Sequence, residues 1–554
     1  MNKKVCSFPI LFALLALLIG TCAVVFPASA QAAPTSTGSI TVSGTVASSY
    51  DAYQIFSANV VDGDSDAKIA TDLAWASDAV RDAALPVLHG AGMLKSQTTA
   101  QEAAEWLNTD SHLTSALSAQ LARSLQSSDA VPLNAGTASE LPCGYWLIVA
   151  DDDSIAQGEA GTAPVMALVG GSAVTVKPKA ATPKVVKHVL EDSTAAWQKA
   201  ADATVADDLY WRLSATVPAG LTAYDTYTVR FVDTMSAGLD PSKVAASMRV
   251  YVAAGADGDF DADPTDKDGR VGTEPAKGWT DITAQCATKV AADGRTFTVR
   301  TGDLIAALGG ADAFTAGARV VAVYNAPLNS ACNHGIAKGN PNEVYLRYPC
   351  SPFADQSGDA GFTRTPSDDA CAYTWDLALT KRGSDGDKPL AGAVLSIADD
   401  RGRTLAADGT WDAEGKATIT TGEDGRVTVS GVDSGKLEVR ELKAPKGYTA
   451  FEGTRSVTVK AEGLDVDQVA AAKPKLTITA ELPLRADSAD GSTGSLEASL
   501  INTPTGTPPS ITTGGFMPST GDMAMYAAAA AAVAGAALIV VALLVKRGGG
   551  SHKE

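Results

Sequence analysis

The stretch SLEASLIN, residues Ser495–Asn502, decides the fold of the C-terminal half of the chain. Side chains of a β-strand point alternately to its two faces, and the apolar residues of this stretch recur at every second position. The stretch therefore predicts a strand with an inward apolar face. Asn502 continues that face at the end of the strand, where a polar residue is unexpected.

Two other stretches have the same form. DLALTK (Asp376–Lys381) and KLEVRE (Lys436–Glu441) each carry two inward aliphatic residues, followed in the same phase by Lys381 and Glu441. Any one of these polar residues is explained by a solvated strand end. Three in one domain instead favour a buried Lys–Glu–Asn triad.

A buried triad of this kind has a specific chemistry. Desolvation lowers the pKa of a lysine and raises that of a carboxylic acid, because burial disfavours both charged forms. A neutral Lys381 is a nucleophile, and a protonated Glu441 can polarise the amide of Asn502. Attack on that amide releases ammonia and leaves a covalent crosslink.

The rest of the chain is read as mainly β. Strands are expected at SITVSG, YWLIVA, YTVRFVD, SMRVYVA, TFTVR, ARVVAVY, EVYLRY and SVTVK, which alternate or are rich in β-branched and aromatic residues. Helix is expected in the first domain, where Thr98-Thr99 and Gln101-Glu102 form a capping box. Its apolar residues recur at helical spacing: Ala103, Trp106, Leu107, Leu113, Leu117 and Leu121. We therefore expect a mixed α/β domain followed by two tandem immunoglobulin-like β-sandwiches.

Both ends of the chain indicate export. Residues 1–30 have the form of a signal peptide, with two lysines, an apolar run and Ala28-Ser29-Ala30 before the cleavage point. Residues 523–545 carry no charge and are long enough to cross a bilayer of roughly 30 Å as a helix. Lys546 and Arg547 then place the tail, residues 546–554, in the cytoplasm.

Breaks in composition divide the exported part. The expected units are an N-terminal domain at 34–178, a central sandwich at 183–352, a third sandwich at 371–503 and a Pro/Thr/Gly stalk at 504–516.

The composition argues against some classes of function. Lys and Arg number 44 against 63 Asp and Glu, and the resulting net charge of −19 argues against nucleic acid as a partner. Neither a phosphate-binding loop nor a zinc-ligand spacing is found, and no enzyme activity toward an external substrate is expected.

The third domain resembles a known family. LAGAVLSI (Leu390–Ile397) after Lys381, and LEVRELKAPKGY (Leu437–Tyr448), resemble the collagen-adhesin B-type domain of Gram-positive surface proteins, and the second stretch is close to the E-box of that family. The resemblance implies an isopeptide bond between Lys381 and Asn502, with Glu441 as the catalytic acid. The chain from SITVSG to YNAPLNSACNHGIAKGNPNEVYLRY is similar to sortase-assembled major pilins.

The segment before the apolar run resembles a sorting signal. MPSTG, residues 517–521, is similar to LPxTG, with Met517 in place of Leu and Pro518, Ser519, Thr520 and Gly521 following. The resemblance implies sortase cleavage between Thr520 and Gly521. It also implies that the cleaved chain is held on the sortase as a thioester until a lysine of a neighbouring subunit attacks it. Lys179, in VTVKPK, is the first choice for this lysine, with Lys177 and Lys184 as alternatives.

The central domain departs from the pattern that the resemblance implies. Lys187 is in phase with two inward valines and Asp233 with Val229 and Phe231, which gives an inward nucleophile and a possible acid. The amide is expected at position 350, which is a cysteine and offers no carbonyl. Either the bond is absent or another residue such as Asn325 substitutes.

Disulfide bonds are the alternative covalent crosslink in this domain. Five cysteines remain after the signal peptide, and the candidates Cys286, Cys332, Cys350 and Cys371 allow three pairings between them. No cofactor is expected. Asp257, Asp259, Asp261 and Asp268 copy part of a calcium loop, but Ala262 occupies the position of its glycine, so a solvated acidic loop is favoured.

Two functions follow from these patterns. The first is a shaft subunit of a covalent pilus, secreted, held in the membrane until sorting and then part of the cell wall or fimbria. Its partners are a sortase, identical subunits and peptidoglycan, with minor pilins and host ligands as further candidates. The second is a monomeric adhesin anchored to peptidoglycan.

Overall fold

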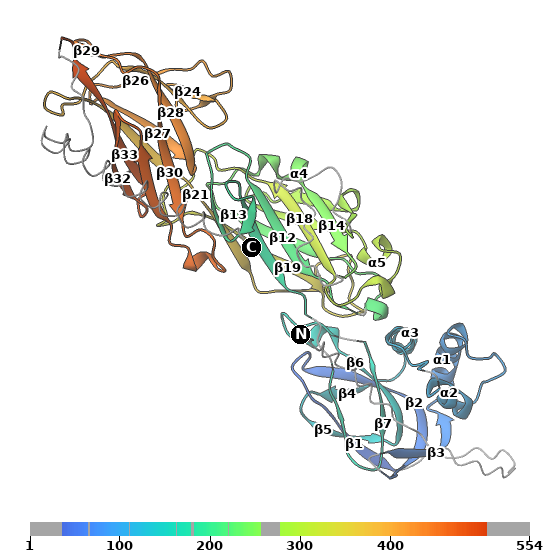
Figure 1. Cartoon of the computed structure of the whole chain (residues 1–554). Coiled ribbons are helices and arrows are strands. Elements are labelled where there is room, and N and C mark those ends of the chain that lie inside the picture. Colours follow the sequence, from blue (N-terminus) through green and yellow to red (C-terminus); the bar gives the residue numbers. More distant parts are fainter. Residues whose placement is uncertain are drawn as a thin grey trace, which may run out of the picture.

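The computed structural model describes residues 36–64, 67–109, 111–161, 163–178, 182–219, 221–255 and 278–506. In Figure 1 these residues form three mainly β domains that follow one another in a row. The expected signal peptide, acidic loop, sorting motif, apolar run and tail lie outside the described residues, as does Lys179.

The N-terminal domain combines two small sheets with three helices. One sheet has the order β5-β1-β8, and the other has the order β3-β2-β6-β7 with β4 paired to β2. The elements are β1 (Thr37–Val42), β2 (Ser49–Asp62), β3 (Lys68–Trp75), α1 (Asp78–Gly90), α2 (Ala100–Leu107), α3 (Ser115–Leu125), β4 (Val131–Asn134), β5 (Ala138–Pro142), β6 (Gly144–Ala150), β7 (Val165–Val169) and β8 (Val174–Val176). The helices pack their apolar faces against β2 and β6.

The helical pattern of this domain divides into two helices. In α2 the Thr99 side chain accepts from the Glu102 backbone, and the Glu102 side chain accepts from the Thr99 backbone, so the expected capping box forms. Leu113 lies in the break before α3, which begins after its own cap, Thr114. The preceding helix α1, capped by Ser77, was not anticipated.

The central domain is a sandwich of two sheets. One has the order β10-β9-β12-β18-β14-β15, and the other has the order β11-β21-β19-β13-β17-β16 with β20 paired to β19. The strands are β9 (Val185–Glu191), β10 (Ala196–Gln198), β11 (Ala200–Asp202), β12 (Tyr210–Thr216), β13 (Arg230–Met235), β14 (Arg249–Ala253), β15 (Thr280–Asp281), β16 (Ala287–Val290), β17 (Thr296–Arg300), β18 (Arg319–Asn325), β19 (Asn340–Pro349), β20 (Phe362–Arg364) and β21 (Asp368–Tyr373); α4 (Val244–Ser247) and α5 (Leu304–Ala307) are single turns. The inward side chains of both sheets form one core.

The third domain is a second sandwich. Its sheets have the orders β27-β22-β33-β29, with β32 paired to β33, and β25-β24-β23-β28-β30-β31, with β26 paired to β23. The strands are β22 (Trp375–Gly383), β23 (Val394–Ala398), β24 (Thr404–Leu405), β25 (Trp411–Asp412), β26 (Ile419–Thr420), β27 (Arg426–Val432), β28 (Gly435–Lys443), β29 (Tyr448–Thr449), β30 (Thr454–Glu462), β31 (Lys475–Ala480), β32 (Leu484–Asp490) and β33 (Ser495–Pro504). The first and last strands, β22 and β33, are parallel neighbours.

The boundary between these two domains differs from the expected one. The expected bounds of the two sandwiches left residues 353–370 outside both of them, but β20 and β21 both pair with β19 in the central sheet. The apolar run Ala370–Tyr373 is short and does not alternate, and the prolines, glycines and aspartates before it indicated a loop. The central domain therefore continues to Tyr373, and a single residue, Thr374, separates it from β22.

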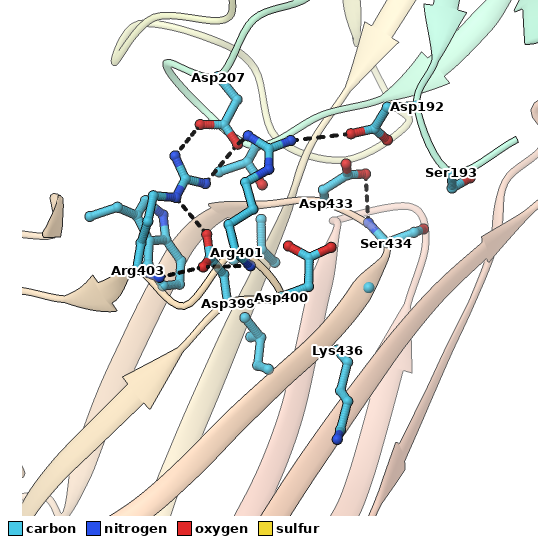
Figure 2. A pocket seen from close by; sticks show the side chains of 15 residues that line it. Asp192, Ser193, Asp207, Asp399, Asp400, Arg401, Arg403, Asp433, Ser434 and Lys436 are labelled. Atoms are coloured by element: carbon cyan, nitrogen blue, oxygen red, sulfur yellow. Dashed lines mark hydrogen bonds and ion pairs between the residues drawn. The ribbon is translucent and has the colours of Figure 1, made fainter. Parts of the chain in front are cut away.

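Charged side chains join the central and third domains. Asp202 accepts hydrogen bonds from Trp375 Nε1 at 2.6 Å and from the backbone and hydroxyl of Ser434. In Figure 2, Arg401 and Arg403 of the third domain point toward Asp207 of the central domain, and Arg401 Nη1 lies 2.8 Å from a carboxylate oxygen of Asp207. These contacts place the entry to β22 against the end of the central sandwich.

Candidate functional site

A cluster of three buried polar side chains lies in the third domain. Lys381 on β22 and Asn502 on β33 come from neighbouring strands of one sheet, and Glu441 on β28 comes from the facing sheet. Their exposed fractions are 1%, 2% and 6%. The period-two reading of the three strands placed all of these side chains inward, and the structure places them together.

One carboxylate oxygen of this cluster faces both nitrogens. Glu441 Oε1 accepts from Asn502 Nδ2 at 2.8 Å and lies 3.5 Å from Lys381 Nζ. The second oxygen, Oε2, accepts from the backbone N–H of Phe451 at 3.1 Å, which fixes the direction of the carboxyl group. Lys381 Nζ also donates to the carbonyl of Leu500 at 3.3 Å.

The segment after Glu441 closes the end of the cluster. The chain leaves β28 through Pro445 and Gly447, whose φ of 86° is readily adopted only by glycine. It then forms β29, in which Tyr448 and Thr449 pair with Pro504 and Thr503. The stretch LKAPKGY therefore carries the strand of Glu441 over to the strand of Asn502.

Burial of the cluster increases the neutral fraction of its amine. Burial lowers the pKa of Lys381 to about 8, and the nearby Glu441 opposes this only in part. Asn502 Oδ1 is buried and has no hydrogen-bond partner among the described residues. The cluster thus holds a nucleophile beside an amide whose carbonyl oxygen lacks a donor.

A second cluster lies inside the central sandwich. Lys187 on β9 and Tyr324 on β18 come from one sheet, and Asp233 on β13 and Asn342 on β19 come from the facing sheet. All four side chains are fully buried. The register pairs Asp233 with Val344 and Met235 with Asn342, so the acid and the amide are diagonal neighbours on one inward face.

Hydrogen bonds connect these four side chains through the tyrosine hydroxyl. Tyr324 Oη accepts from Lys187 Nζ at 2.9 Å and from Asn342 Nδ2 at 2.8 Å, and it donates to Asp233 Oδ2 at 2.9 Å. Lys187 Nζ also forms an ion pair with Asp233 Oδ2. Burial lowers the pKa of Lys187 to about 8 and raises the pKa of Asp233.

The amide of this second cluster is Asn342, which the sequence reading did not identify. Cys350 lies at the other end of β19, where its carbonyl accepts from Gly161 of the N-terminal domain at 2.6 Å. Asn325 is occupied elsewhere, by Asp208 and the backbone of Leu209. Cys350 therefore lies outside the cluster, as its lack of an amide led us to expect, and so does the alternative amide, Asn325. The available signal was phase: Asn342 precedes Val344, Leu346 and Tyr348 on the same inward face.

The expected disulfides are not present. Cys286, Cys332, Cys350 and Cys371 are all free thiols in the structure, as is Cys143. Two of these thiols donate to backbone carbonyls, Cys286 Sγ to that of Ile282 and Cys371 Sγ to that of Ala372. Burial raises the pKa of the thiols of Cys286, Cys332, Cys350 and Cys371 to about 11.

Two of the three candidate linkage lysines are described, and both are exposed. Lys177 follows β8 directly, and Lys184 precedes β9. Within the described ranges, no helix is long and apolar enough to cross a membrane, and no group of three or more His, Cys, Asp or Glu residues could hold a metal ion.

Comparison with known proteins locates one family. Residues 376–473 match the model of the SpaA family, described as a prealbumin-like fold domain. The matched segment contains Lys381 and Glu441. The trypsin-resistant surface T6 protein of Streptococcus pyogenes serotype M6 is 29% identical over 143 residues, which cover 24% of this chain and 24% of that protein. The chain thus matches about a quarter of the length of this relative.

Pilins are among the solved structures to which this chain is similar. The T6 backbone pilin of Streptococcus pyogenes serotype M6 is 17% identical, with a TM-score of 0.45 over 86% of this chain and all of that one. The full-length major pilin SpaD of Corynebacterium diphtheriae is 14% identical, with a TM-score of 0.41 over the same shares.

Proposed function

We propose that the chain is the repeating shaft subunit of a covalent cell-surface pilus. The observation that carries this proposal is the position of the third-domain cluster: Lys381 is on the strand by which the chain enters the domain, and Asn502 is on the strand by which it leaves. A bond between them would carry tension past the whole domain. The streptococcal relative is named as a surface protein, which agrees with a cell-surface location for this chain.

The bond forms within the folded domain. Neutral Lys381 Nζ attacks Asn502 Cγ, and the electron pair of the carbonyl moves onto Oδ1. Glu441 Oε1, which faces both nitrogens, takes a proton from Nζ and delivers one to Nδ2. The Cγ–Nδ2 bond then breaks, ammonia leaves, the carbonyl re-forms, and Glu441 returns to its starting state. The fixed geometry supplies the effective concentration that this reaction needs.

The central domain holds a second bond of the same kind, between Lys187 and Asn342, with Asp233 as the acid. Its support is the burial of all four side chains of the cluster and the hydrogen bonds that connect them. The backbone of Lys187 is also held, because Asp368 accepts from its N–H and Lys199 donates to its carbonyl.

Polymerisation joins the sorting motif near the C-terminus of one chain to a lysine at the junction of the N-terminal and central domains of another. A sortase cleaves MPSTG between Thr520 and Gly521, and a lysine of the next subunit resolves the acyl-enzyme. Lys179 is the first candidate, and the exposed Lys177 and Lys184 are the alternatives. The last subunit is transferred to peptidoglycan.

The test is an immunoblot of cell-wall extracts boiled in detergent. A shaft subunit gives a ladder of high-mass species, and Lys179→Ala should collapse the ladder to one wall-attached band. Lys177→Ala and Lys184→Ala are the matched controls. A single band from the wild-type chain would overturn the pilus proposal and indicate a singly anchored adhesin.

A further inference from the structure

Transfer of an amide from ammonia to lysine needs two opposite proton movements. The attacking nitrogen must lose a proton, and the leaving nitrogen must gain one before it departs as ammonia. In the third domain a single atom is placed for both, since Glu441 Oε1 faces Lys381 Nζ and Asn502 Nδ2.

The central cluster is built differently. Its acid is an aspartate, one methylene shorter, and no hydrogen bond joins Asp233 to Asn342 in the described part of the chain. The atom that contacts both nitrogens is instead Tyr324 Oη, at 2.9 Å from Lys187 Nζ and 2.8 Å from Asn342 Nδ2. The same hydroxyl donates to Asp233 Oδ2 at 2.9 Å.

We propose that Tyr324 is a catalytic residue of the central site, which relays a proton from Asp233 to the leaving nitrogen of Asn342. The inference rests on the proposed Lys187–Asn342 bond. As Nζ bonds to Cγ, it gives a proton to Asp233 Oδ2. Asp233 passes a proton to Tyr324 Oη, and Tyr324 gives its own hydroxyl proton to Nδ2. The Cγ–Nδ2 bond breaks, ammonia leaves, and both Asp233 and Tyr324 end in the states in which they began.

The surroundings of the hydroxyl suit a relay that stays neutral. Burial raises the pKa of Tyr324 well above its ordinary value, and the carboxylate of Asp233 adds to this effect, so the phenol does not ionise on its own. The ring is held by edge-to-face packing on Phe297, with centroids 4.9 Å apart. Asp233 Oδ1 and Asn342 Oδ1 are both buried without a partner, which leaves the relay as the connection from this acid to this amide.

The test compares Tyr324→Phe with the wild type. Full-length chain is made in a cell-free reaction, sampled over time, denatured and digested with trypsin, and the branched peptide joining Lys187 to Asn342 is quantified. We expect the branched peptide to form about 100-fold more slowly, because a general acid–base group typically contributes a factor of this size to a reaction rate. The Lys381–Asn502 peptide in the same sample should form at the wild-type rate.

Two controls separate catalysis from structure. Tyr227→Phe removes a hydroxyl from another fully buried tyrosine of the same core and should leave the rate unchanged. Fluorotyrosine at position 324 keeps the hydroxyl but makes it more acidic, so the rate should change with no change in shape. This variant decides the matter if Tyr324→Phe fails to fold.

The outcomes are distinct. Wild-type rates in both Tyr324→Phe and the fluorotyrosine chain would overturn the relay but leave the central bond in place. Absence of the branched peptide from the wild-type chain would overturn the central bond itself, and the relay with it.

Discussion

Lys381 and Asn502 lie on the same inward face of two hydrogen-bonded parallel strands, where Lys381 pairs with Leu500 and Asn502 pairs with Gly383. The two side chains are therefore diagonal neighbours, at a separation that a long lysine side chain can span. Parallel pairing of the first and last strands brings the two side chains together, because it places the C-terminal ends of both strands side by side. The sheet thus positions Lys381 and Asn502, and Glu441 reaches them from the facing sheet.

Removal of the acid should abolish the third-domain bond alone. Glu441→Ala leaves Lys381 and Asn502 in place but removes the oxygen that faces both nitrogens. We expect the deficit of the measured mass against the sequence mass to be smaller in the variant than in the wild type by one ammonia molecule, with the unbranched Lys381 and Asn502 peptides recovered after digestion. Glu438→Ala, on the outer face of the same strand, is the matched control. A branched peptide in Glu441→Ala would assign the proton transfer to another group.

Asn342 should be the amide of the central bond. Asn342→Ala is expected to remove the Lys187 branched peptide, whereas Asn325→Ala and Cys350→Ser should retain it, because neither residue contacts the cluster. The measurement is tryptic mapping of each variant. Loss of the branch in Asn325→Ala with its retention in Asn342→Ala would contradict the assignment.

The inward faces could be predicted from the sequence because alternation along a strand is local. That rule placed Lys187, Asp233, Lys381, Glu441 and Asn502 correctly in the two cores. The place of Asn342 in the central cluster was missed because phase alone does not say which end of β19 meets β13. That choice depends on the antiparallel register, in which Met235 pairs with Asn342.

Tyr324 was missed for a related reason. An inward tyrosine in the stretch ARVVAVY reads as ordinary core, and its hydroxyl gains a role only when three other strands bring partners to it. The contacts of Asp202 and Asp207 at the domain junction are equally non-local. The strands β20 and β21 could also be recognised only from their pairing with β19, since neither shows an alternating pattern.

The unbonded third domain should become more stable as pH rises. In Asn502→Ala, Lys381 remains a buried amine whose pKa is lowered from 10.5 to about 8. Between pH 8 and 10.5 the unfolded chain binds a proton that the folded domain does not, so the free energy of unfolding increases with pH in this window. Below pH 8 the buried amine of Lys381 destabilises the folded domain to its full extent, and above pH 10.5 this effect is lost.

Calorimetry across that window tests this pH dependence. The third-domain transition is the one that Asn502→Ala shifts relative to the wild type, in which the proposed bond would make Lys381 an amide that does not titrate. The double variant Asn502→Ala/Lys381→Met is the matched control, because it removes the amine and should lose the pH dependence. An equal slope in the double variant would assign the titration to another group.

Tension in a shaft would reach the third domain at the start of β22 and leave it after β33. Without a crosslink, the load falls on strand hydrogen bonds that contribute about 1 kcal/mol each. With the Lys381–Asn502 bond, the load passes along β22 to Lys381, through one amide, and out after Asn502. Residues 382–501 then lie in a closed loop that carries no load. By the loop-closure entropy that applies to disulfides, a crosslink that closes a loop of this length also stabilises the fold by roughly 4–5 kcal/mol.

Pulling the protein through its ends in a single-molecule experiment should therefore give no extension from the wild-type third domain. In Glu441→Ala the same domain should unfold and release residues 382–501, adding up to about 400 Å of contour length at the reach of an extended chain. Glu438→Ala should behave as the wild type, since it changes an exposed glutamate of the same strand and leaves the cluster intact. The central domain provides an internal reference, because its own cluster is unchanged in all three proteins. A wild-type third domain that extends as far as Glu441→Ala would mean that the force path does not run through Lys381 and Asn502, and the proposed mechanical role of this site would fall with it.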